Sequence, residues 1–303
     1  MDFTKELKEK RPNLSVTSLK TYNSLLKTIY RNSFEDKDGD VSKFDDDEQI
    51  CKFLSTKPFS ARKTYLSALV CICPTNKKYK ELMLDDIKTY NHETDKMEMN
   101  EKQKLNHVTN EKIREVQLQL KQDADAIFKK QNITINDLQK VQDYIIVCLL
   151  GGQMGIVPRR ALDYTEFKIR NINQEHDNYL DKNTLYFNKY KTSKFYGQQS
   201  LTIPTPLKNI LNKWIKIIPA NIDYLLFNTS GNKLTAVTLN QRLNKIFNGY
   251  ISINALRHAY LTDKYADVMK KEQEMAEEMS EMGSSEKQAK IYIRFPKKEL
   301  KDK

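Results

Sequence analysis

The hydrophobic pattern of this sequence changes its period once, and that change constrains the fold more than any other feature. Apolar residues recur at helical spacing over most of the chain, beginning with the segment 16–30. Three short segments rich in β-branched and aromatic residues interrupt this pattern. They are 167–172, 183–190 and 199–204. A polar stretch separates the last two, which predicts a hairpin around a long loop. We therefore expect a mainly α-helical protein with a small antiparallel β-sheet inserted after Arg160.

The helical segments form two groups, which we expect to be separate domains. A chain of 303 residues is long enough for two domains of ordinary size. We predict an N-terminal helical domain at 1–91, a linker at 92–107 and a second domain at 108–303. The linker segment is charged and loses its apolar periodicity, although a solvated helix extension explains it nearly as well. The expected helices lie at 16–30, 45–54, 60–73, 80–90, 109–130, 136–150, 205–218, 234–247 and around Arg257. The charged remainder, 263–295, is also expected to be helical, with a break at Gly283.

Five residues mark expected helix ends. Ser60 suits the N-cap of one helix, and Pro74 stops the same helix. Gly151 and Gly152 end the most apolar helix. Pro158 suits the first turn of the helix that follows.

The charge balance favours a polyanionic partner. Lys and Arg number 51 against 40 Asp and Glu, which gives a net charge of +11. Nucleic acid is the first candidate partner for such an excess, and a merely basic surface is the alternative. The longest apolar run, 141–150, is far shorter than a membrane span, and the N-terminus lacks a signal-peptide core. We therefore expect no membrane partner.

The cysteines and histidines do not predict a metal site. The four cysteines include the pair Cys71 and Cys73, whose spacing is not that of a zinc site. We expect reduced, mostly buried thiols, which fit an intracellular compartment. Four histidines are too few for histidine-cluster metal chemistry, so neither a metal nor another cofactor is expected.

Four segments place polar or charged side chains in unusual surroundings. They are VPRRALDY with Arg159 and Arg160, KYKTSKFYGQQSLTIP with Lys191, NALRHAYLTD with Arg257 and His258, and EMGSSEKQAKIYIRF with Tyr292. The apolar frame around Arg257 would suit a buried helix face. Burying an arginine is costly unless its charge meets a partner. Either an internal carboxylate pairs with Arg257, or this side chain awaits an anion from outside.

In this order the four segments resemble the catalytic boxes of the tyrosine recombinases, the phage-integrase family. Members carry an arginine on a helix with an acid three residues later, as Arg160 and Asp163 do here, and Arg159 is the second choice. The family's hairpin lysine corresponds to Lys191, with Lys194 as the runner-up.

The last two boxes depart from the family pattern. Members usually read His-x-x-Arg-His where this chain has Asn254, Arg257 and His258. They usually read Leu-Gly-His before the tyrosine, where this chain has Met-Gly-Ser ending at Ser284 and then Tyr292. Asparagine cannot take up a proton at neutral pH, and serine has a shorter reach than histidine.

The resemblance covers about 108–295 and implies a site-specific DNA recombinase or integrase. Tyr292 would attack a DNA phosphate and form a 3′-phosphotyrosine. Arg160 and Arg257 would bind the non-bridging oxygens, and Lys191 would protonate the leaving 5′-oxygen. Further candidates are Asn254, His258 and Ser284 in the catalytic site, and Arg159, Lys194, Arg62 and Lys63 in DNA binding.

The resemblance also implies partners and a setting. Double-stranded DNA is the expected partner, and members usually work as tetramers on two duplexes, so a homo-oligomer is expected. The Asn-, Lys- and Ile-rich composition resembles integrases of large DNA viruses, virophages or eukaryotic mobile elements. Such an enzyme would act in a host nucleus or a viral factory.

Ordinary alternatives stand beside each assignment. Arg257 could be a structural ion-pair partner, Lys191 a solvated lysine and Tyr292 a packing tyrosine; Tyr260 and Tyr265 fit the nucleophile less well. At the level of function, the alternatives are a non-catalytic DNA-binding protein of the same fold, and an enzyme like a type IB topoisomerase or a telomere resolvase.

Overall fold

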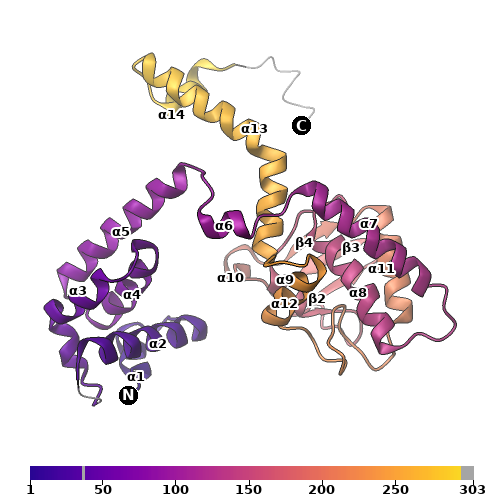
Figure 1. The fold of residues 1–303 in the computed structure, drawn as a ribbon, viewed down its shortest axis with the longest axis horizontal. Coiled ribbons are helices and arrows are strands. Elements are labelled where there is room, and N and C mark those ends of the chain that lie inside the picture. The colour runs from indigo at the N-terminus through magenta and orange to yellow at the C-terminus, as the bar shows by residue number, and fades with distance from the viewer. Residues whose placement is uncertain (36–37, 295–303) are drawn as a thin grey trace. The chain divides into compact units, whose positions relative to one another are not determined.

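The computed structural model describes residues 1–35 and 38–294 (Figure 1). By its internal contacts the chain divides into two compact units, Met1–Met99 and Asn100–Lys303. The division falls inside the segment 92–107, for which a linker was predicted. Much of that segment is helical, because α5 (Lys77–Asp95) continues into it and α6 (Glu101–Leu105) follows. The alternative of a solvated helix extension therefore describes its first residues.

The N-terminal unit is a small helical bundle. Its elements are α1 (Thr4–Lys10), α2 (Val16–Ser33), η1 (Val41–Asp45), α3 (Asp47–Ser55), α4 (Phe59–Ile72) and α5. Phe3, Tyr30 and Phe44 form an aromatic cluster in its core. Buried Tyr79 donates a hydrogen bond from its hydroxyl to the Phe44 carbonyl at 2.8 Å, which joins α5 to η1. A buried phenol that finds an acceptor in this way carries no desolvation penalty.

One predicted helix start in this unit is wrong. Helix α4 begins at Phe59 with Pro58 at its N-cap position, and Ser60 makes no capping hydrogen bond. Pro58 has the extended backbone of an N-cap, so the helix begins two residues earlier than an N-cap at Ser60 would place it. Pro74 lies just beyond the last helical residue, Ile72, as predicted.

The core of the second unit surrounds one helix. Helix α8 (Ile135–Leu150) is buried along most of its length, and α7 (Asn110–Ile127) and α11 (Thr205–Ile217) pack against it. A capping box between Thr134 and Asp137 starts α8, and Gly151 ends it as predicted. Trp214 of α11 stacks on Phe227, with ring centres 5.7 Å apart. Burial on all sides explains why the second half of α8, residues 144–150, is uniformly apolar.

A four-stranded sheet lies in the second unit, in the order β1-β2-β3-β4. The strands are β1 (Phe167–Lys168), β2 (Asn178–Asp181), β3 (Thr184–Phe187) and β4 (Gln199–Thr202). Strands β3 and β4 form the predicted hairpin, and the short helix α10 (Ser193–Tyr196) lies in its connection. The expectation of a purely antiparallel sheet is wrong, because β1 pairs with β2 in parallel. Strand β2 was not predicted; it is short and flanked by polar residues.

The segments on either side of the sheet carry the helices of interest. Helix α9 (Ala161–Thr165) precedes β1, and Arg160 is its N-cap. Pro158 lies before this helix and not in its first turn, which corrects the prediction. Helix α12 (Ala236–Ile246) packs near α9, and α13 (Ile253–Glu281) follows it.

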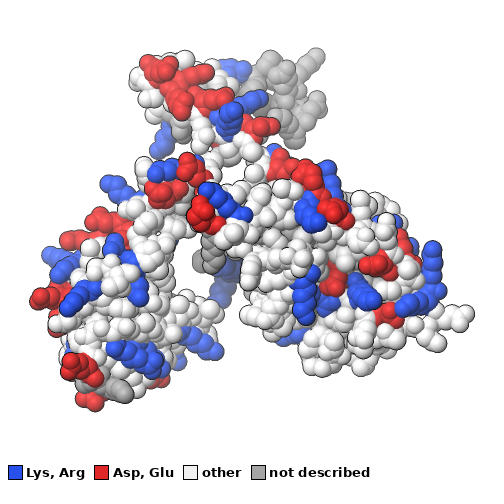
Figure 2. All heavy atoms as spheres, viewed as in Figure 1, with Lys and Arg blue, Asp and Glu red and all other residues white. Residues whose placement is uncertain are grey.

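The chain ends, within the described residues, in a long helix and a short one. Gly283 has a φ of 68°, which breaks the helix after α13, and α14 (Glu286–Tyr292) follows. The break at Gly283 was predicted. The far half of α13 is acidic, and Figure 2 shows red side chains gathered over that end of the unit. The exposed acids there are Glu272, Glu274, Glu277, Glu278 and Glu281. The positive excess of the chain is therefore not spread evenly over its helices.

Two further expectations concern the thiols and the membrane. All four cysteines are unpaired; Cys73 and Cys148 are buried, and Cys51 and Cys71 are half-buried. Burial raises the pKa of the Cys73 and Cys148 thiols to about 12, which makes both poor nucleophiles. No helix in the described ranges combines the length and the apolar character needed to cross a bilayer.

Candidate active site

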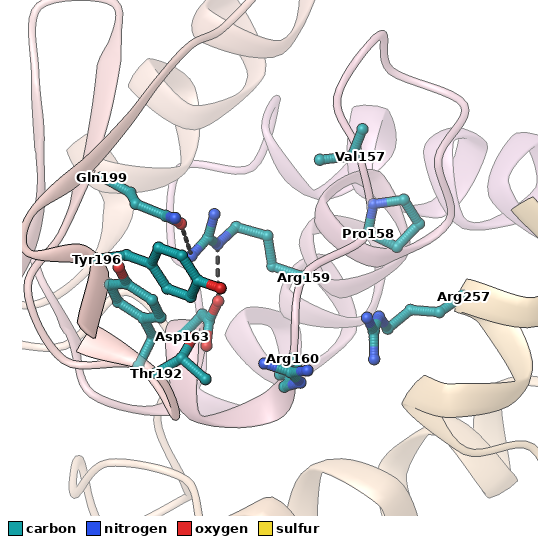
Figure 3. Close-up of a pocket in the computed structure, with 10 residues that line it drawn as sticks. Val157, Pro158, Arg159, Arg160, Asp163, Thr192, Tyr196, Gln199 and Arg257 are labelled. Atoms are coloured by element: carbon teal, nitrogen blue, oxygen red, sulfur yellow. Dashed lines mark hydrogen bonds and ion pairs between the residues drawn. The ribbon is translucent and has the colours of Figure 1, made fainter. Parts of the chain in front are cut away.

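Three of the four unusual sequence segments meet around one cavity of about 300 Å³ (Figure 3). Its lining comes from the start of α9, the β3–β4 hairpin and the first turns of α13. The lining residues are Val157, Pro158, Arg159, Arg160, Asp163, Tyr190, Thr192, Tyr196, Gln199 and Arg257. Three arginines from two segments far apart in sequence, the start of α9 and helix α13, therefore line one small space, an arrangement that suits an anion.

Arg159 is satisfied within the fold. Its Nε donates to Asp163 Oδ2 at 2.7 Å, and its Nη2 donates to Gln199 Oε1 at 3.0 Å (Figure 3). Its guanidinium also lies 4.0 Å from the centre of the Phe187 ring, a cation–π contact. The acid in the Arg-x-x-Asp spacing thus pairs with Arg159, four residues before it, and not with Arg160.

Asp163 is a buried acid that depends on this arginine. Its side chain is 5% exposed, and its Oδ1 is buried without a hydrogen-bond partner in the described part of the chain. Burial raises the pKa of the Asp163 carboxyl above its ordinary value, although the charge of Arg159 acts in the opposite direction. Asp163 and Arg159 therefore form a structural pair that braces the start of α9.

Arg160 and Arg257 have the opposite surroundings. Arg160 is exposed at the N-cap of α9, and Arg257 is half-buried on α13. Neither guanidinium donates a hydrogen bond to, or forms an ion pair with, another residue of 1–35 or 38–294. The carboxylate of Asp163 interacts electrostatically with both arginines, but it already forms an ion pair with Arg159. Among the described residues, then, no internal carboxylate pairs with Arg257.

The backbone around Arg257 is nevertheless fixed. Ser252 caps α13 by accepting a hydrogen bond from the Ala255 amide at 3.2 Å. Leu256 is fully buried beside Arg257, and Ala259 is 5% exposed one turn away. The apolar frame noticed in the sequence is therefore the anchored face of α13, and it holds the base of Arg257 against the core.

The two candidate lysines lie in the β3–β4 connection. The side chains of Lys191 and Lys194 are exposed, and neither forms an ion pair or hydrogen bond with any described residue. Lys191 stands between Tyr190 and Thr192, which both line the cavity. The Lys191 side chain itself does not line it. Its backbone position at the rim leaves the side chain free to reach a ligand in the cavity.

Asn178 is a residue that the pattern of the sequence did not single out. It is 0% exposed, and its Nδ2 donates to the carbonyls of Asp163 at 2.9 Å and Lys189 at 2.8 Å. Its Oδ1 accepts from the amides of Asn188 at 2.8 Å and Lys189 at 2.7 Å. One side chain thus joins the arginine helix to the segment that leads to Lys191. The only sign of this role in the sequence was a polar amide side chain, in a segment that was not predicted to be a strand.

A buried acid supports the same segment. Asp177 is 3% exposed and forms ion pairs with Lys168 at 2.9 Å and Lys189 at 3.2 Å. Burial alone would raise the pKa of Asp177, but hydrogen bonds from the Asn173 amide and both lysines lower it to about 2. Its negative charge is therefore retained at any physiological pH.

Asn254 and His258 lie on the same helix as Arg257 but outside the cavity lining. Both are exposed, and their four-residue spacing places them on one face of α13. They can reach a ligand that extends out of the cavity, whereas a ligand confined to it meets neither.

Ser284 and Tyr292 are not brought to the cavity. Ser284 follows the Gly283 break, and Tyr292 is the last residue of α14, with 69% of its surface exposed. At about 1.5 Å per residue, the far end of α13 lies roughly 36 Å along the helix from Arg257. Figure 1 shows α14 beside that far end, away from α9. In this conformation the fourth sequence box is separate from the other three.

The two DNA-binding candidates of the N-terminal unit are engaged within that unit. Arg62 donates twice to buried Asp86, from Nε to Oδ2 at 2.9 Å and from Nη2 to Oδ1 at 2.6 Å. Lys63 lies over the ring of Tyr90. A role of Arg62 and Lys63 in DNA binding remains a prediction. The fold gives the Arg62 guanidinium an internal partner that a DNA phosphate would have to share.

The described residues contain no group of three or more His, Cys, Asp or Glu side chains arranged to hold a metal ion.

Among solved structures, the chain is similar to recombinases and an integrase. No family model and no curated protein sequence matches the chain. Among solved structures, the chain is similar to a lambda integrase dimer bound to a COC′ core site, with 15% identity, a TM-score of 0.46 and coverage of 89% of this chain and 94% of that one. It is also similar to the XerH site-specific recombinase bound to difH, with 14% identity, a TM-score of 0.45 and coverage of 87% and 75%.

A third similar structure is the XerA recombinase, with 11% identity, a TM-score of 0.35 and coverage of 86% of this chain and 83% of that one. These are proteins of the kind that the sequence motifs resemble. At these values the similarity by itself assigns no chemistry to this chain.

Proposed function

We propose that this chain is a tyrosine-type DNA recombinase or integrase that cuts and rejoins double-stranded DNA. The observation that carries the proposal is the pair Arg160 and Arg257, two arginines without internal partners that line one cavity. A fold that pairs Arg159 with Asp163 and Gln199 and leaves these two unpaired is suited to an external anion. A backbone phosphate of DNA is the anion that the basic composition favours.

The proposed reaction is a transesterification. The Tyr292 oxygen attacks the phosphorus and forms a 3′-phosphotyrosine, the bond from phosphorus to the 5′-oxygen breaks, and the phenolic proton is lost to solvent. Lys191 gives a proton to the departing 5′-oxygen, so that a 5′-hydroxyl leaves. Arg160 and Arg257 each offer a planar fork of donors to the non-bridging oxygens, where charge grows in the transition state. The reverse attack by another 5′-hydroxyl rejoins the strands.

Asn254, His258 and Ser284 have supporting roles in this proposal. Asn254 and His258 share the exposed face of α13 beside Arg257 and can donate hydrogen bonds to a phosphate outside the cavity. Ser284 can donate only if the segment after Gly283 approaches the DNA. Arg159 acts indirectly in this scheme, because it braces α9 through Asp163.

The proposal includes an assembly on DNA. Because Tyr292 lies at the far end of α13 from its own cavity, a second copy can supply the tyrosine to the arginines of the first. A homo-oligomer, a tetramer on two duplexes, is the proposed working form. We further propose a viral or mobile-element origin and action in a host nucleus or viral factory, on the basis of the Asn-, Lys- and Ile-rich composition.

A DNA-binding protein without catalysis is the second candidate. It is favoured by the separation of Tyr292 from the cavity, and by Asn254 and Ser284 at positions where the family usually has histidine or a similar donor. A topoisomerase-like enzyme with the same phosphotyrosine is told apart by relaxation of supercoiled DNA without strand exchange.

A covalent trap tests the proposal. The protein is incubated with nicked duplexes taken from the ends of the genetic element that encodes it, then denatured and examined on a gel for a protein–DNA adduct. A nick near the cleavage point lets the short 5′-hydroxyl strand diffuse away, which prevents religation. We expect an adduct with the wild type that is absent in Tyr292→Phe.

Tyr265→Phe is the matched control, because Tyr265 is also an exposed tyrosine of this region, on α13. An adduct that persists in Tyr292→Phe would mean that another tyrosine attacks. DNA binding by the wild type without any adduct would favour the non-catalytic candidate. A mixture of Tyr292→Phe and Arg257→Ala proteins extends the assay: we expect adduct to return, because the intact tyrosine of one copy meets the intact arginines of the other.

A further inference from the structure

The connection between β3 and β4 presents two aromatic side chains to solvent at the rim of the cavity. Phe195 is 83% exposed and Tyr196 is 69% exposed, both on the short helix α10. Tyr196 also lines the cavity that Arg160 and Arg257 share. Figure 3 shows Tyr196 on the Gln199 side of that cavity, with Arg257 on the opposite side. The proposed recombination chemistry gives neither aromatic residue a role.

The connection is an ordered structure and does not trail loosely from the sheet. The Tyr190 hydroxyl donates to the Gly197 carbonyl at 2.7 Å, which closes its base. The Gly197 amide donates to the Ser193 carbonyl at 2.8 Å, and the Phe195 amide donates to the Thr192 carbonyl at 3.0 Å. Gly197 has a φ of 64°, a conformation that suits glycine. These contacts hold α10 in place while they leave Phe195 without packing partners.

Keeping a phenylalanine in water has a cost. Burial of such a side chain stabilises a fold, and this fold forgoes most of that gain at Phe195. Phe195 and Tyr196 are neighbours and together form an exposed aromatic patch beside the cavity, and contiguous exposed apolar patches mark interaction sites.

The charges around the ring indicate what that partner is. Lys191 and Lys194 are exposed on the same connection and have no ion-pair partner in the described ranges. Together with Arg160 and Arg257 they make the cavity rim cationic. An acidic polymer with flat aromatic faces matches a cationic rim that bears an exposed aromatic ring. DNA has both properties, with phosphates for the cations and bases for the ring.

We propose that Phe195 stacks on a DNA base next to the phosphate bound by Arg160 and Arg257, with Tyr196 beside it. This inference rests on the proposed function, because it places the base on the same DNA. The stacked ring would hold an unstacked base at the cleavage point and keep the hairpin seated, so that Lys191 stays near the 5′-oxygen. Aromatic wedges act in this way in other protein–DNA complexes, where they unstack a base step.

The test separates base stacking from charge attraction with two polyanions. Duplex DNA carries phosphates and bases, whereas inorganic polyphosphate carries phosphates alone. The reporter is Phe195→Trp, whose indole would lie at the exposed position. Its signal is readable because the chain has one tryptophan, Trp214, which is fully buried. Leu118→Trp, on an exposed position of α7, is the matched control.

We expect DNA to quench the fluorescence of Phe195→Trp and shield it from acrylamide, and polyphosphate to leave it accessible. Phe195→Ala should bind DNA about tenfold more weakly with an unchanged salt slope, since each base–aromatic stack has that order of effect. Its affinity for polyphosphate should equal that of the wild type. Lys194→Ala should weaken binding to DNA and to polyphosphate alike, and its salt slope on DNA should be smaller by about one.

Three results would overturn the inference. If Phe195→Ala binds DNA as the wild type does, or if polyphosphate shields the reporter as well as DNA does, base stacking is refuted while DNA binding stands. If the wild type binds no DNA at any salt concentration, the proposed function fails and this inference fails with it.

Discussion

The arginines that line the cavity have opposite environments. We call the side with Arg159 the satisfied wall and the side with Arg160 and Arg257 the open wall. On one wall, Arg159 has a carboxylate, an amide and an aromatic ring as partners, all from its own fold. On the other wall, Arg160 and Arg257 have no such partner among the described residues. The two arginines of the Arg159–Arg160 pair are adjacent in the chain, yet their surroundings differ completely.

This difference teaches how to separate structural charges from functional ones. A buried or half-buried charge must be compensated, because taking it out of water costs several kcal/mol. Where the fold supplies the compensation, the charge stabilises the fold. Where the fold supplies no compensating partner for a charge, an external ligand can supply that partner. The following variants test whether Arg159 has a structural role and whether Arg160 and Arg257 bind a ligand.

The largest expected effect is on stability at the satisfied wall. Arg159→Ala would leave Asp163 as a buried charge without its partner, so we expect a loss of about 3–5 kcal/mol in the free energy of unfolding. Urea unfolding followed by circular dichroism measures this. The double variant Arg159→Ala with Asp163→Asn should recover part of the loss. If Arg159→Ala kept the stability of the wild type but lost DNA binding, Arg159 would be a ligand-binding residue and not a structural one.

At the open wall the effect is expected on rate and not on stability. Arg257→Ala and Arg160→Ala should each slow adduct formation about 10²- to 10³-fold, because each removes a preorganised donor from the phosphate. Their unfolding free energies should stay within about 0.5 kcal/mol of the wild type. Single-turnover adduct assays provide the rates.

Arg257→Lys is the conservative control for this wall. It should recover only part of the rate, because an ammonium cannot offer the planar fork of a guanidinium. A large loss of stability in Arg257→Ala would instead show that its charge has an internal partner, and the distinction between the walls would fail.

A smaller effect is expected in the frame behind Lys191. Asp177 has a folded-state pKa of about 2 against an ordinary value of 3.8, so its ionised form stabilises the fold. This contribution, about 2 kcal/mol, is complete above pH 4 and is lost as the pH falls through about 2. Asp177→Asn should therefore be less stable than the wild type at neutral pH, and the gap should narrow as the pH falls from 4. Urea titrations at pH 7, 5 and 3 measure the gap; a gap that is constant with pH would contradict the ion-pair role.

Much of the fold could be predicted from the sequence because it depends on local patterns. Helices α2, α7, α8, α11 and α12 follow apolar periodicity, and the hairpin β3–β4 follows from two β-type segments around a polar loop. Strand β2 and the parallel pairing of β1 were not predicted, because pairing joins segments by tertiary contact and leaves no periodic trace in four residues.

The candidate site shows the same division. The resemblance matched Arg160 to the family's arginine because Asp163 follows it by three residues, whereas in the fold Asp163 pairs with Arg159, four residues earlier. Both spacings place side chains on one helix face, so only the course of the backbone at the start of α9 could choose between them. Asn178 was missed for a related reason, since its four hydrogen bonds go to residues that are distant in sequence or in undetected turns.

By itself, the sequence determined which residue types were available and on which elements they lie: arginines on two helices, a lysine and aromatic residues on a hairpin, and a tyrosine after a glycine break. Local propensity and apolar spacing are enough for that, because they act within a few residues. Only the tertiary structure decided which arginine is paired, that Asn178 joins two parts of the site, and that Tyr292 ends away from its own cavity. Those outcomes depend on how charges and polar groups from distant segments are compensated once they are packed together, and that compensation is a property of the folded chain.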